Sequence, residues 1–537
     1  MKKGFTLIEL MGVIIILGVL ALITYPVIDK SIKQSREKAI DRTIENLIEA
    51  SYNYSIKNDL GYNSYYKKLE FETLAQAGYI EKEIINPVTN KKLEGCIIYK
   101  WNESNNQYEF EYSETCEVPL ILYKDNSGAN SPELLNNMIP VYYDGTNWVY
   151  ANIYEEWYDY NAKEWANAVV LTDGVSKNVG DTINEDEIAL WYVWIPRYTY
   201  TIFNGNNESV NEQEIQIKFE NGTNSSGTVE CVDAISGSRT NSETCTDDTN
   251  GSIKNGTSTY THPAFTFGDK ELTGFWVGKF ELSTTDTTCN TTPNKTNCDK
   301  IHTINTKPNI SSLRFINVSN LFTSIQNVSL DFSLNGDSHI MKNMEWGAVA
   351  YLSHSKYGIG NKEIGLNNNT SYITGCGAEE GTSPSNECNK YDTTLGILAS
   401  TTGNIYGIYD MSGGAYEYIM GNMVDTNGNF YNSNAGFNEN HPNSKYYDSY
   451  TYNTSYITHE RGKLGDATKE ILKSFGTATG GWYGNNSYFP SNSRSWFIRG
   501  GNNTVLSYQG IFNFYYYYGN ASDLGDCSSR IVIISNS

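Results

Sequence analysis

The most apolar stretch of the chain lies near its start, over residues 5–28, and Glu9 is the one charged residue within it. A run of this length can span a bilayer as a helix, whereas a secretory signal peptide has a shorter apolar core followed by a small-residue cleavage site. Apolar residues then recur about every 3.6 residues, which predicts that the helix continues to about residue 60. They are Ile32, Ala39, Ile40, Ile44, Leu47 and Ile48. An ordinary tail-out membrane anchor is the alternative interpretation.

After this helix the pattern changes to short strands separated by turns. Within residues 61–118, the segments 96–99 and 108–112 alternate as strands do and flank the turn residues Asn105 and Asn106. This spacing predicts a hairpin in a small head. Cys96 and Cys116 lie just outside the hairpin, where a disulfide between them would clamp it.

The remaining residues divide into two further predicted parts. Residues 119–187 open with a segment of linker composition at 126–132 and then hold short aromatic-centred strands, so we expect a separate β-rich spacer module there. Residues 188–537 contain aromatic strands at 191–195 and 275–280, a helical pattern at 344–352 and a last strand near 530–534. The predicted fold class is therefore α+β, with one long N-terminal helix.

Charge and cysteine content place the chain outside the cytoplasm. The 39 basic and 61 acidic residues give a net charge of −22, which would repel nucleic acid. Eight of the nine cysteines lie in local pairs that suit disulfides in an oxidising compartment, and Cys527 is left over. A metal site is the alternative, but none of the pairs is a CxxC and no histidine lies at ligand spacing from them. The four pairs are Cys96 with Cys116, Cys231 with Cys245, Cys289 with Cys298, and Cys376 with Cys388.

The first residues resemble the processing site of type IV prepilins. The motif is Gly4-Phe5-Thr6-Leu7-Ile8-Glu9-Leu10. The resemblance implies that residues 1–4 are a leader removed after Gly4 by a prepilin peptidase, and that Phe5 becomes the methylated N-terminus. It also implies that Glu9 pairs with the N-terminus of a neighbouring pilin subunit, and Pro26 lies where pilins often bend this helix. A carboxylate inside a membrane needs such a cationic partner.

Residues 188–537 resemble the formylglycine-generating, sulfatase-modifying family, which has a C-type-lectin-like core. The resemblance is carried by residues 404–418, by Arg499-Gly500-Gly501, and by Arg530 near the end. It implies a C-type-lectin-like fold for this part. The catalytic members use two cysteines after the Arg-Gly-Gly segment, working with copper, and the corresponding positions here are Val505 and Gly510. We therefore expect no enzyme activity and no cofactor.

Other catalytic and metal motifs are equally weak. The six histidines form no HxxxH or HExxH pattern, and there is no GxSxG, Walker or dinucleotide-binding signature. Residues 425–429 resemble the start of a calcium loop but lack the bidentate glutamate at its end, so we interpret them as a turn. We expect no catalytic residues and no metal.

The segment 480–530 is rich in Tyr, Asn, Ser and Gly, the composition of surfaces that recognise many partners. It resembles the variable proteins of diversity-generating retroelements, in which codons near the C-terminus are rewritten. A frame of Trp496, Arg499, Gly500, Gly501, Gly510 and Arg530 would stay constant. The residues that we expect to contact a ligand are Tyr483, Asn485, Asn486, Asn502, Asn503, Thr504, Ser507, Tyr508, Asn513, Tyr515, Tyr517, Asn520, Ser522, Asp523, Leu524, Asp526, Cys527 and Ser528.

Strand alternation limits this prediction. Tyr515 and Tyr517 cannot share a face with Tyr516 and Tyr518 in a regular strand, so at least half of that run should be packing. A tyrosine-rich edge strand without a ligand is the alternative for this segment.

The sequence as a whole predicts a single-pass membrane protein that displays an ectodomain at the cell surface or in a pilus. Its expected partners are prepilin peptidase, other pilin subunits, and an extracellular protein or glycan. Two alternatives remain: a fixed minor-pilin adhesin without diversification, and an enzyme of the sulfatase-modifying type.

Overall fold

The computed structural model divides the chain into two compact units, Met1–Leu122 and Tyr123–Ser537. Each unit is described by itself. The residues that the structure describes are 6–58, 60, 66–102, 105–118, 122–201, 211–227, 259–285, 304–379, 381–431, 435–437, 441–492, 494–503, 509–516 and 525–536.

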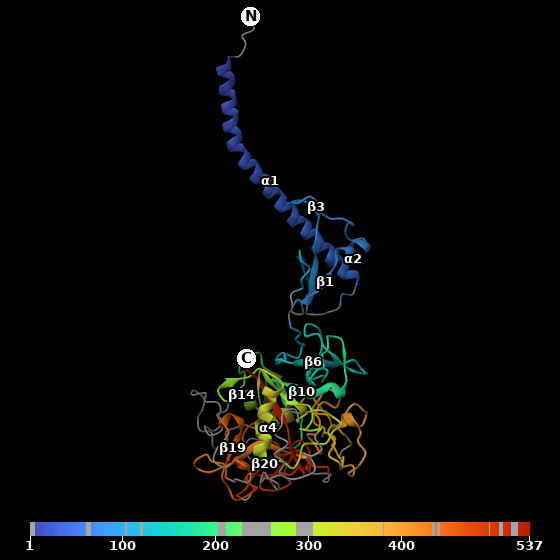
Figure 1. The fold of residues 1–537 in the computed structure, drawn as a ribbon, viewed down its shortest axis with the longest axis vertical. Coiled ribbons are helices and arrows are strands. Elements are labelled where there is room, and N and C mark those ends of the chain that lie inside the picture. Colours follow the sequence, from blue (N-terminus) through green and yellow to red (C-terminus); the bar gives the residue numbers. More distant parts are fainter. Residues whose placement is uncertain are drawn as a thin grey trace. The chain divides into compact units, whose positions relative to one another are not determined.

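The first unit begins with one long helix, α1, which spans Leu7–Lys57 and contains Pro26 without interruption (Figure 1). Thr6 caps the helix, because its hydroxyl accepts a hydrogen bond from the Glu9 amide while the Glu9 carboxylate accepts one from the Thr6 amide. Among the described residues, α1 is the one helix long and apolar enough to cross a membrane. The predicted long N-terminal helix is confirmed, and it spans Leu7–Lys57 where residues 5–60 were expected.

The end of α1 packs on a small antiparallel sheet, as predicted for the head. Strand β4 (Cys96–Asn102) pairs along its length with β5 (Gln107–Ser113) and on its other side with β1 (Lys67–Leu69). Leu47 of α1 packs with Leu74 and Ile97 in the core of this unit. A short helix and a two-stranded ribbon complete it: α2 (Phe71–Gln76), β2 (Ile85–Asn86) and β3 (Lys91–Lys92).

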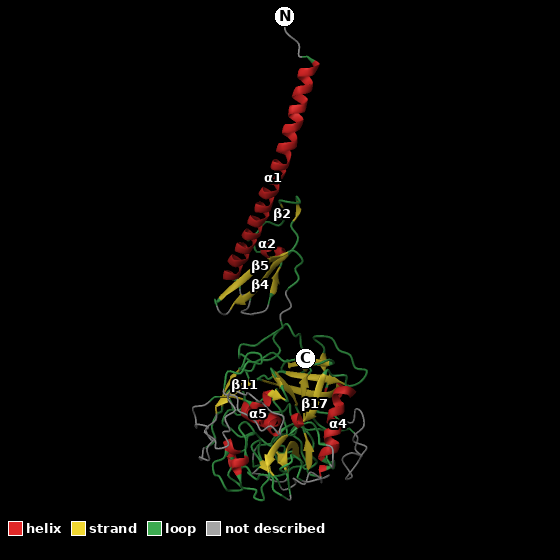
Figure 2. Cartoon of the chain, turned by 90° about the vertical axis from the view of Figure 1, so that its left-hand side faces the viewer, coloured by secondary structure: helices red, strands yellow, loops and turns green. Residues whose placement is uncertain are grey.

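The centre of the second unit is an eight-stranded antiparallel sheet in the order β17-β23-β16-β10-β8-β6-β7-β9 (Figure 2). Its strands are β6 (Met138–Tyr143), β7 (Trp148–Tyr150), β8 (Asn167–Leu171), β9 (Thr182–Ile183), β10 (Ile188–Pro196), β16 (Gly274–Gly278), β17 (Gly336–Ile340) and β23 (Ile531–Ser535).

This sheet differs from the expected domain organisation. Strands β6 to β9 lie in residues 119–187, for which we predicted a separate spacer module, yet β8 pairs with β10 of the following part. The first strands are thus one half of the large sheet. The reason is physical: β8 is buried through Val170 and needs a partner strand on each edge, and β6 and β10 provide them.

A second sheet carries the candidate site. Its order is β19-β18-β20-β21, and β22 also pairs with β18. Smaller ribbons are β12-β11-β13 and β14-β15. The strand bounds are β11 (Tyr198–Thr201), β12 (Gln216–Phe219), β13 (Tyr260–Thr261), β14 (Thr266–Phe267), β15 (Lys270–Glu271), β18 (Tyr416–Val424), β19 (Asp448–Thr451), β20 (Trp496–Arg499), β21 (Phe514–Tyr515) and β22 (Cys527–Ser529).

Helices complete the second unit. Among the described residues of this unit, the α-helices that pack on its sheets are α4 (Val318–Asp331) and α5 (Asn343–Ser353). Every residue of α5 is buried, which explains why its sequence is apolar all round rather than on one face. The short 3₁₀ helices are η1 (Glu185–Glu187), η3 (Pro263–Phe265), η5 (Gly396–Ala399), η7 (Ser444–Tyr446), η8 (His459–Arg461), η9 (Lys469–Ile471) and η10 (Trp482–Gly484).

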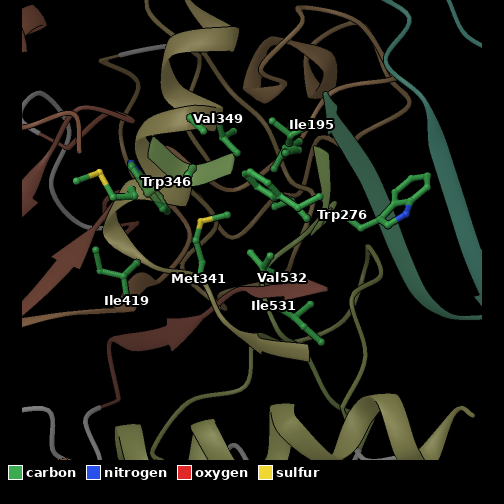
Figure 3. Packing of buried hydrophobic residues seen from close by; sticks show 14 of the residues in the cluster. Ile195, Trp276, Met341, Trp346, Val349, Ile419, Ile531 and Val532 are labelled. Carbon is green, nitrogen blue, oxygen red and sulfur yellow. The ribbon is translucent and has the colours of Figure 1, made fainter. Parts of the chain in front are cut away.

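The main core lies between the two sheets and α5 (Figure 3). Strand β10 is buried at all nine positions, which is why it reads as a continuous apolar run. Trp276 and Trp346 fill the interior with Met341 between them. Gly274 has no side chain because a Cβ there would overlap the Trp194 ring on the paired strand.

Two of the predicted disulfides are present, Cys96–Cys116 in the head and Cys376–Cys388 in the second unit. The other two predicted pairs, Cys231 with Cys245 and Cys289 with Cys298, lie outside the described residues. They stay predictions.

Candidate ligand-binding surface

Arg499 is the last residue of β20, the strand that pairs with β21 of the candidate surface. Its guanidinium is fully buried and donates hydrogen bonds to Asn343 Oδ1 at 2.8 Å, to the Ala467 carbonyl at 3.1 Å and to the Asp466 carbonyl. Burial lowers the pKa of Arg499 to about 10. The side chain therefore holds the loop at 466–467 and helix α5 against β20, which is a structural role.

The glycines that follow Arg499 explain the local turn. Gly500 has a positive φ of 63°, and a Cβ on Gly501 would overlap Gln509. Gly500 thus has a backbone conformation that favours glycine, and Gly501 allows the chain to approach Gln509 closely.

Arg530 is a second fully buried arginine whose hydrogen bonds hold several segments together. It donates to both carboxylate oxygens of Glu417, to the Gly278 carbonyl at 2.8 Å and to the Tyr409 carbonyl at 2.8 Å. Burial raises the pKa of Glu417, and Arg530 opposes that rise. This pair joins the last strand to β18 and contributes to the frame rather than to a surface.

Six of the expected ligand contacts are buried and belong to this frame. Asn485 accepts a hydrogen bond from the Gly510 amide, and Asn513 donates one to the Gly500 carbonyl. Asn503 donates to the Asn369 carbonyl at 2.7 Å. A buried amide is hydrogen-bonded to the protein rather than to a ligand, so for these residues the prediction of a ligand contact is corrected. The six are Asn485, Asn502, Asn503, Asn513, Cys527 and Ser528.

Cys527, one of these six residues, lies in the core. It lies on β22 opposite Tyr416, is fully buried, and is the free cysteine among the described residues. Burial raises the pKa of its thiol. It is therefore a small apolar core residue and not a contact at the surface.

Four expected contacts are half-buried and face outward in part. Tyr483 has a positive φ of 57° and its hydroxyl donates to the Asn361 carbonyl at 2.8 Å. Asp526 accepts a hydrogen bond from the Tyr372 hydroxyl at 2.7 Å. Tyr515 is the last residue of β21, and the Phe514 amide of the same strand donates a hydrogen bond to the Asn486 carbonyl at 3.1 Å. The remaining expected contacts lie outside the described residues: Thr504, Ser507, Tyr508, Tyr517, Asn520, Ser522, Asp523 and Leu524.

Around β21 four tyrosines form one group, here named the tyrosine cluster: Tyr456, Tyr488, Tyr515 and Tyr516. The rings of Tyr456 and Tyr516 are stacked with centroids 5.3 Å apart. Tyr488 lies 5.2 Å from Tyr456, 5.5 Å from Tyr516 and 5.0 Å from Tyr515. Tyr456 is 40% exposed and the other three are half-buried.

One cation adjoins the tyrosine cluster. The Arg494 guanidinium lies 5.4 Å from the centre of the Tyr516 ring, within cation–π range. Stiff phenol rings with polar tips beside an arginine are the side chains most enriched at recognition hot spots. Chemically, this group can stack on a flat ligand surface and exchange hydrogen bonds through its hydroxyls.

Backbone and side-chain hydrogen bonds fix the two segments that supply the cluster. The Phe489 amide donates to the Tyr456 carbonyl at 2.8 Å. Arg461 donates to the Pro490 carbonyl at 2.9 Å and to the Ser455 carbonyl at 3.0 Å. Burial lowers the pKa of Arg461 to about 10. The loop at 455–461 is thus attached to the segment at 487–490.

His459 adds a third link between these segments. Its Nδ1 accepts a hydrogen bond from the Gly476 amide at 3.2 Å, so Nε2 carries the proton and donates to the Ser487 carbonyl at 2.8 Å. Burial lowers the pKa of His459, which favours this neutral form. His459 therefore links the loop at 455–461 to the backbone at Gly476 and at Ser487.

Sequence reasoning missed four members of this surface. Tyr456 lies outside the segment 480–530, and Tyr488, Arg494 and Tyr516 lie inside it but were not among the expected contacts. The dense tyrosines at 446–456 were the available signal. The alternation argument was also wrong for Tyr516: β21 ends at Tyr515, so Tyr515 and Tyr516 both join the cluster.

The structure offers little support for metal chemistry among the described residues. Glu70, Cys96 and Cys116 place three potential ligand atoms together, but the two cysteines are joined in a disulfide and supply no thiolate. In the loop at 425–429, Asp425 accepts hydrogen bonds from the amides of Asn427 and Asn429, so its carboxylate closes a turn.

Comparison with known proteins supports the N-terminal assignment. Residues 1–25 match the family described as "Prokaryotic N-terminal methylation motif". The chain therefore carries a prepilin-type motif followed by an apolar helix, as in a membrane-anchored pilin-like protein. No curated protein matches the chain.

Two solved structures are similar to the chain at 10% sequence identity each. "Treponema denticola variable protein 1" has a TM-score of 0.24, with 66% of this chain and 98% of that chain covered. "Major Tropism Determinant U1 Variant" has a TM-score of 0.23, with 82% of this chain and 80% of that chain covered.

Proposed function

We propose that this protein is a pilin-like, single-pass membrane protein that displays a non-catalytic binding domain outside the cell. The methylation motif and helix α1 support processing by prepilin peptidase and assembly with pilin subunits. The two disulfides among the described residues, one in the head of the first unit and one in the second unit, support export of both parts. Resemblance of residues 188–537 to sulfatase-modifying, C-type-lectin-like domains is part of this proposal.

The observation that carries the binding role is the tyrosine cluster. Two of its members, Tyr515 and Tyr516, lie in the sequence between the segments 504–508 and 517–524, whose Tyr, Asn and Ser content suits recognition. The buried amides of Asn485, Asn503 and Asn513 hold the surrounding backbone in place, so the surface is preorganised. The ligand would be an extracellular protein or glycan.

The enzyme alternative has a specific weakness in this chain. Gly510 and Val505 stand where the catalytic members of the family have cysteines, and the free Cys527 is buried. A thiol oxidation needs an accessible thiolate. We therefore propose a binding protein rather than an oxidase.

The test is binding of the full-length protein, held in lipid nanodiscs, to a printed glycan array and to an array of folded extracellular protein domains. We expect Tyr456→Ala and Tyr516→Ala each to weaken binding of the ligand so found by about tenfold or more, as for aromatic hot spots. Tyr431→Ala is the matched control, because the Tyr431 ring packs on Tyr452. Equal binding by all three variants would overturn the assignment of this surface.

A further inference from the structure

Lys279 is a fully buried lysine at an unusual position in the large sheet. It follows β16, and its amide donates to the Trp191 carbonyl on β10 at 2.8 Å. Three rings surround its Nζ, with centroids at 4.9 Å for Trp148, 5.2 Å for Trp191 and 5.7 Å for Tyr409. Among the described residues no carboxylate forms an ion pair with it.

The nearest polar side chain is the amide of Asn167, which opens strand β8. Lys279 Nζ lies 2.8 Å from Asn167 Oδ1 and 2.7 Å from the Ile405 carbonyl oxygen. Both side chains are fully buried. Strands β16 and β8 lie on opposite sides of β10, so this contact reaches across one face of the sheet.

Neighbouring groups determine how the Asn167 amide is oriented. Trp191 Nε1 donates to Asn167 Oδ1 at 2.9 Å. Asn167 Nδ2 donates to the Trp165 carbonyl at 2.8 Å and to the Tyr406 carbonyl at 2.9 Å. Because the indole N–H can only donate and the two backbone carbonyls can only accept, the amide oxygen must face Trp191 Nε1, and this places it toward Lys279 as well.

This arrangement places an amine against a polarised amide at a fully buried site. Burial lowers the pKa of Lys279 well below its usual range, which favours the neutral amine, the nucleophilic form of the side chain. The Trp191 N–H is positioned to stabilise negative charge on Oδ1, as a donor in an oxyanion hole does. The two backbone carbonyls hold the nitrogen that would leave.

We propose that Lys279 and Asn167 become joined by an intramolecular isopeptide bond. A bond forms between Lys279 Nζ and Asn167 Cγ, and the bond between Cγ and Nδ2 breaks. One proton passes from Nζ to Nδ2, which leaves as ammonia, so the reaction needs no oxidant, cofactor or water. The product covalently links β8 to the end of β16 across β10.

Such a link has a use in a protein of this topology. A force applied at the N-terminal side of the second unit reaches β6 first, and β6 pairs directly with β8. The bond would attach these strands to the centre of the sheet, independently of hydrogen bonds. This inference does not depend on the ligand or on the tyrosine cluster.

The test is peptide mapping by mass spectrometry of the full-length protein purified in detergent and reduced before digestion. We expect a branched peptide that joins the Asn167 and Lys279 segments, lighter than their sum by one ammonia, and no tryptic cleavage after Lys279. Lys279→Met and Asn167→Ala should abolish the branched peptide. Lys270→Met, at a lysine on the neighbouring ribbon that donates to the Ser535 carbonyl, should leave it intact.

The wild-type measurement is decisive even if the two variants do not fold. Recovery of separate Asn167 and Lys279 peptides at their sequence masses, with cleavage after Lys279, would overturn the proposal. In that case Lys279 would be an ammonium held by two carbonyl oxygens and three rings.

Discussion

The rings of Tyr456 and Tyr516 are stacked, with planes inclined by only 8°. Tyr456 comes from the loop before η8, whereas Tyr516 follows β21 and precedes the segment 517–524. The surface thus combines a tyrosine outside the segment 480–530 with residues inside it. Any diversification confined to the C-terminal codons would act beside a constant aromatic neighbour.

The first prediction concerns which codons vary in a population. Sequencing the end of the gene across many cells should find substitutions at the half-buried Asn486 and Tyr515 and within residues 517–524. Asn485, Asn503 and Asn513 should stay constant, because losing a buried hydrogen bond costs about 1–3 kcal/mol.

The pattern separates the two binding proposals. Constancy at every one of these codons would remove the retroelement interpretation and favour a fixed minor-pilin adhesin. Frequent substitution at Asn485 or Asn513 would contradict the assignment of these amides to the frame.

The second prediction concerns assembly. In the structure the Glu9 carboxylate accepts two hydrogen bonds from Thr6, at 2.9 Å each, and so caps its own helix. In a pilus it would instead need a cationic partner, which a neighbouring N-terminus supplies. Glu9→Ala should therefore reduce incorporation into pili while the second unit keeps its thermal unfolding midpoint.

The matched control for assembly is Glu49→Ala, which removes an exposed carboxylate further along α1. Immunogold labelling and pilus shearing would report incorporation. Normal incorporation of the Glu9→Ala chain would contradict the role of Glu9.

Local patterns predicted the elements whose causes are local. The apolar run and the 3.6-residue period that follows it predicted α1, and the Asn105-Asn106 turn predicted the β4–β5 hairpin, because sequence neighbours decide both. The close cysteine pairs likewise predicted the Cys376–Cys388 disulfide.

The sequence pattern could not predict which strands, distant in the sequence, pair with one another. Strand β8 could be recognised as a strand, but alternation does not say that it pairs with β10 rather than closing a separate module. The same holds for the candidate site. Asn485 and Asn513 look like polar surface residues until the fold brings Gly510 and Gly500 to them. Tyr456 joins the cluster only through the loop that Arg461 holds.

The third prediction concerns the disulfides. Replacing both Cys376 and Cys388 by serine should lower the free energy of unfolding of the second unit by about 3 kcal/mol, the value expected for a short closed loop. Chemical denaturation followed by tryptophan fluorescence would measure it. Cys527→Ser is the control for loss of a cysteine without loss of a bridge.

Thiol labelling of the denatured, unreduced protein extends this test to the remaining pairs. If all four predicted bridges exist, Cys527 is the one cysteine that reacts. Labelling of Cys231, Cys245, Cys289 or Cys298 would contradict the corresponding bridge.

The fourth prediction concerns pH. Glu470 is fully buried, and its carboxyl group contacts the Tyr351 hydroxyl at 2.5 Å, the Gly465 amide at 2.7 Å and the Tyr200 hydroxyl at 3.1 Å. Burial raises the pKa of Glu470 to about 8 from its ordinary 4.5. The folded chain therefore keeps a proton between these two values that the unfolded chain releases.

The sign of the effect follows from this difference in proton binding. Stability should fall as the pH rises from about 4.5 to about 8 and then level off, because the unfolded state binds fewer protons throughout that window. Glu281, Asp410 and Asp448 are also buried with raised pKa values, so they contribute in the same direction. The slope of the wild type alone cannot be assigned to one group.

The Glu470→Gln variant measures the contribution of Glu470 to this pH dependence of stability, because glutamine keeps the shape of the protonated side chain and cannot ionise. Thermal unfolding at about pH 5 should differ little between the variant and the wild type, whereas at about pH 9 the variant should be more stable by a few kcal/mol. Glu460→Gln, at an exposed carboxylate on η8, should follow the wild type at both pH values. Parallel curves for wild type and Glu470→Gln would mean that Glu470 is already ionised in the folded protein, and that its tyrosine and amide donors offset the cost of burial.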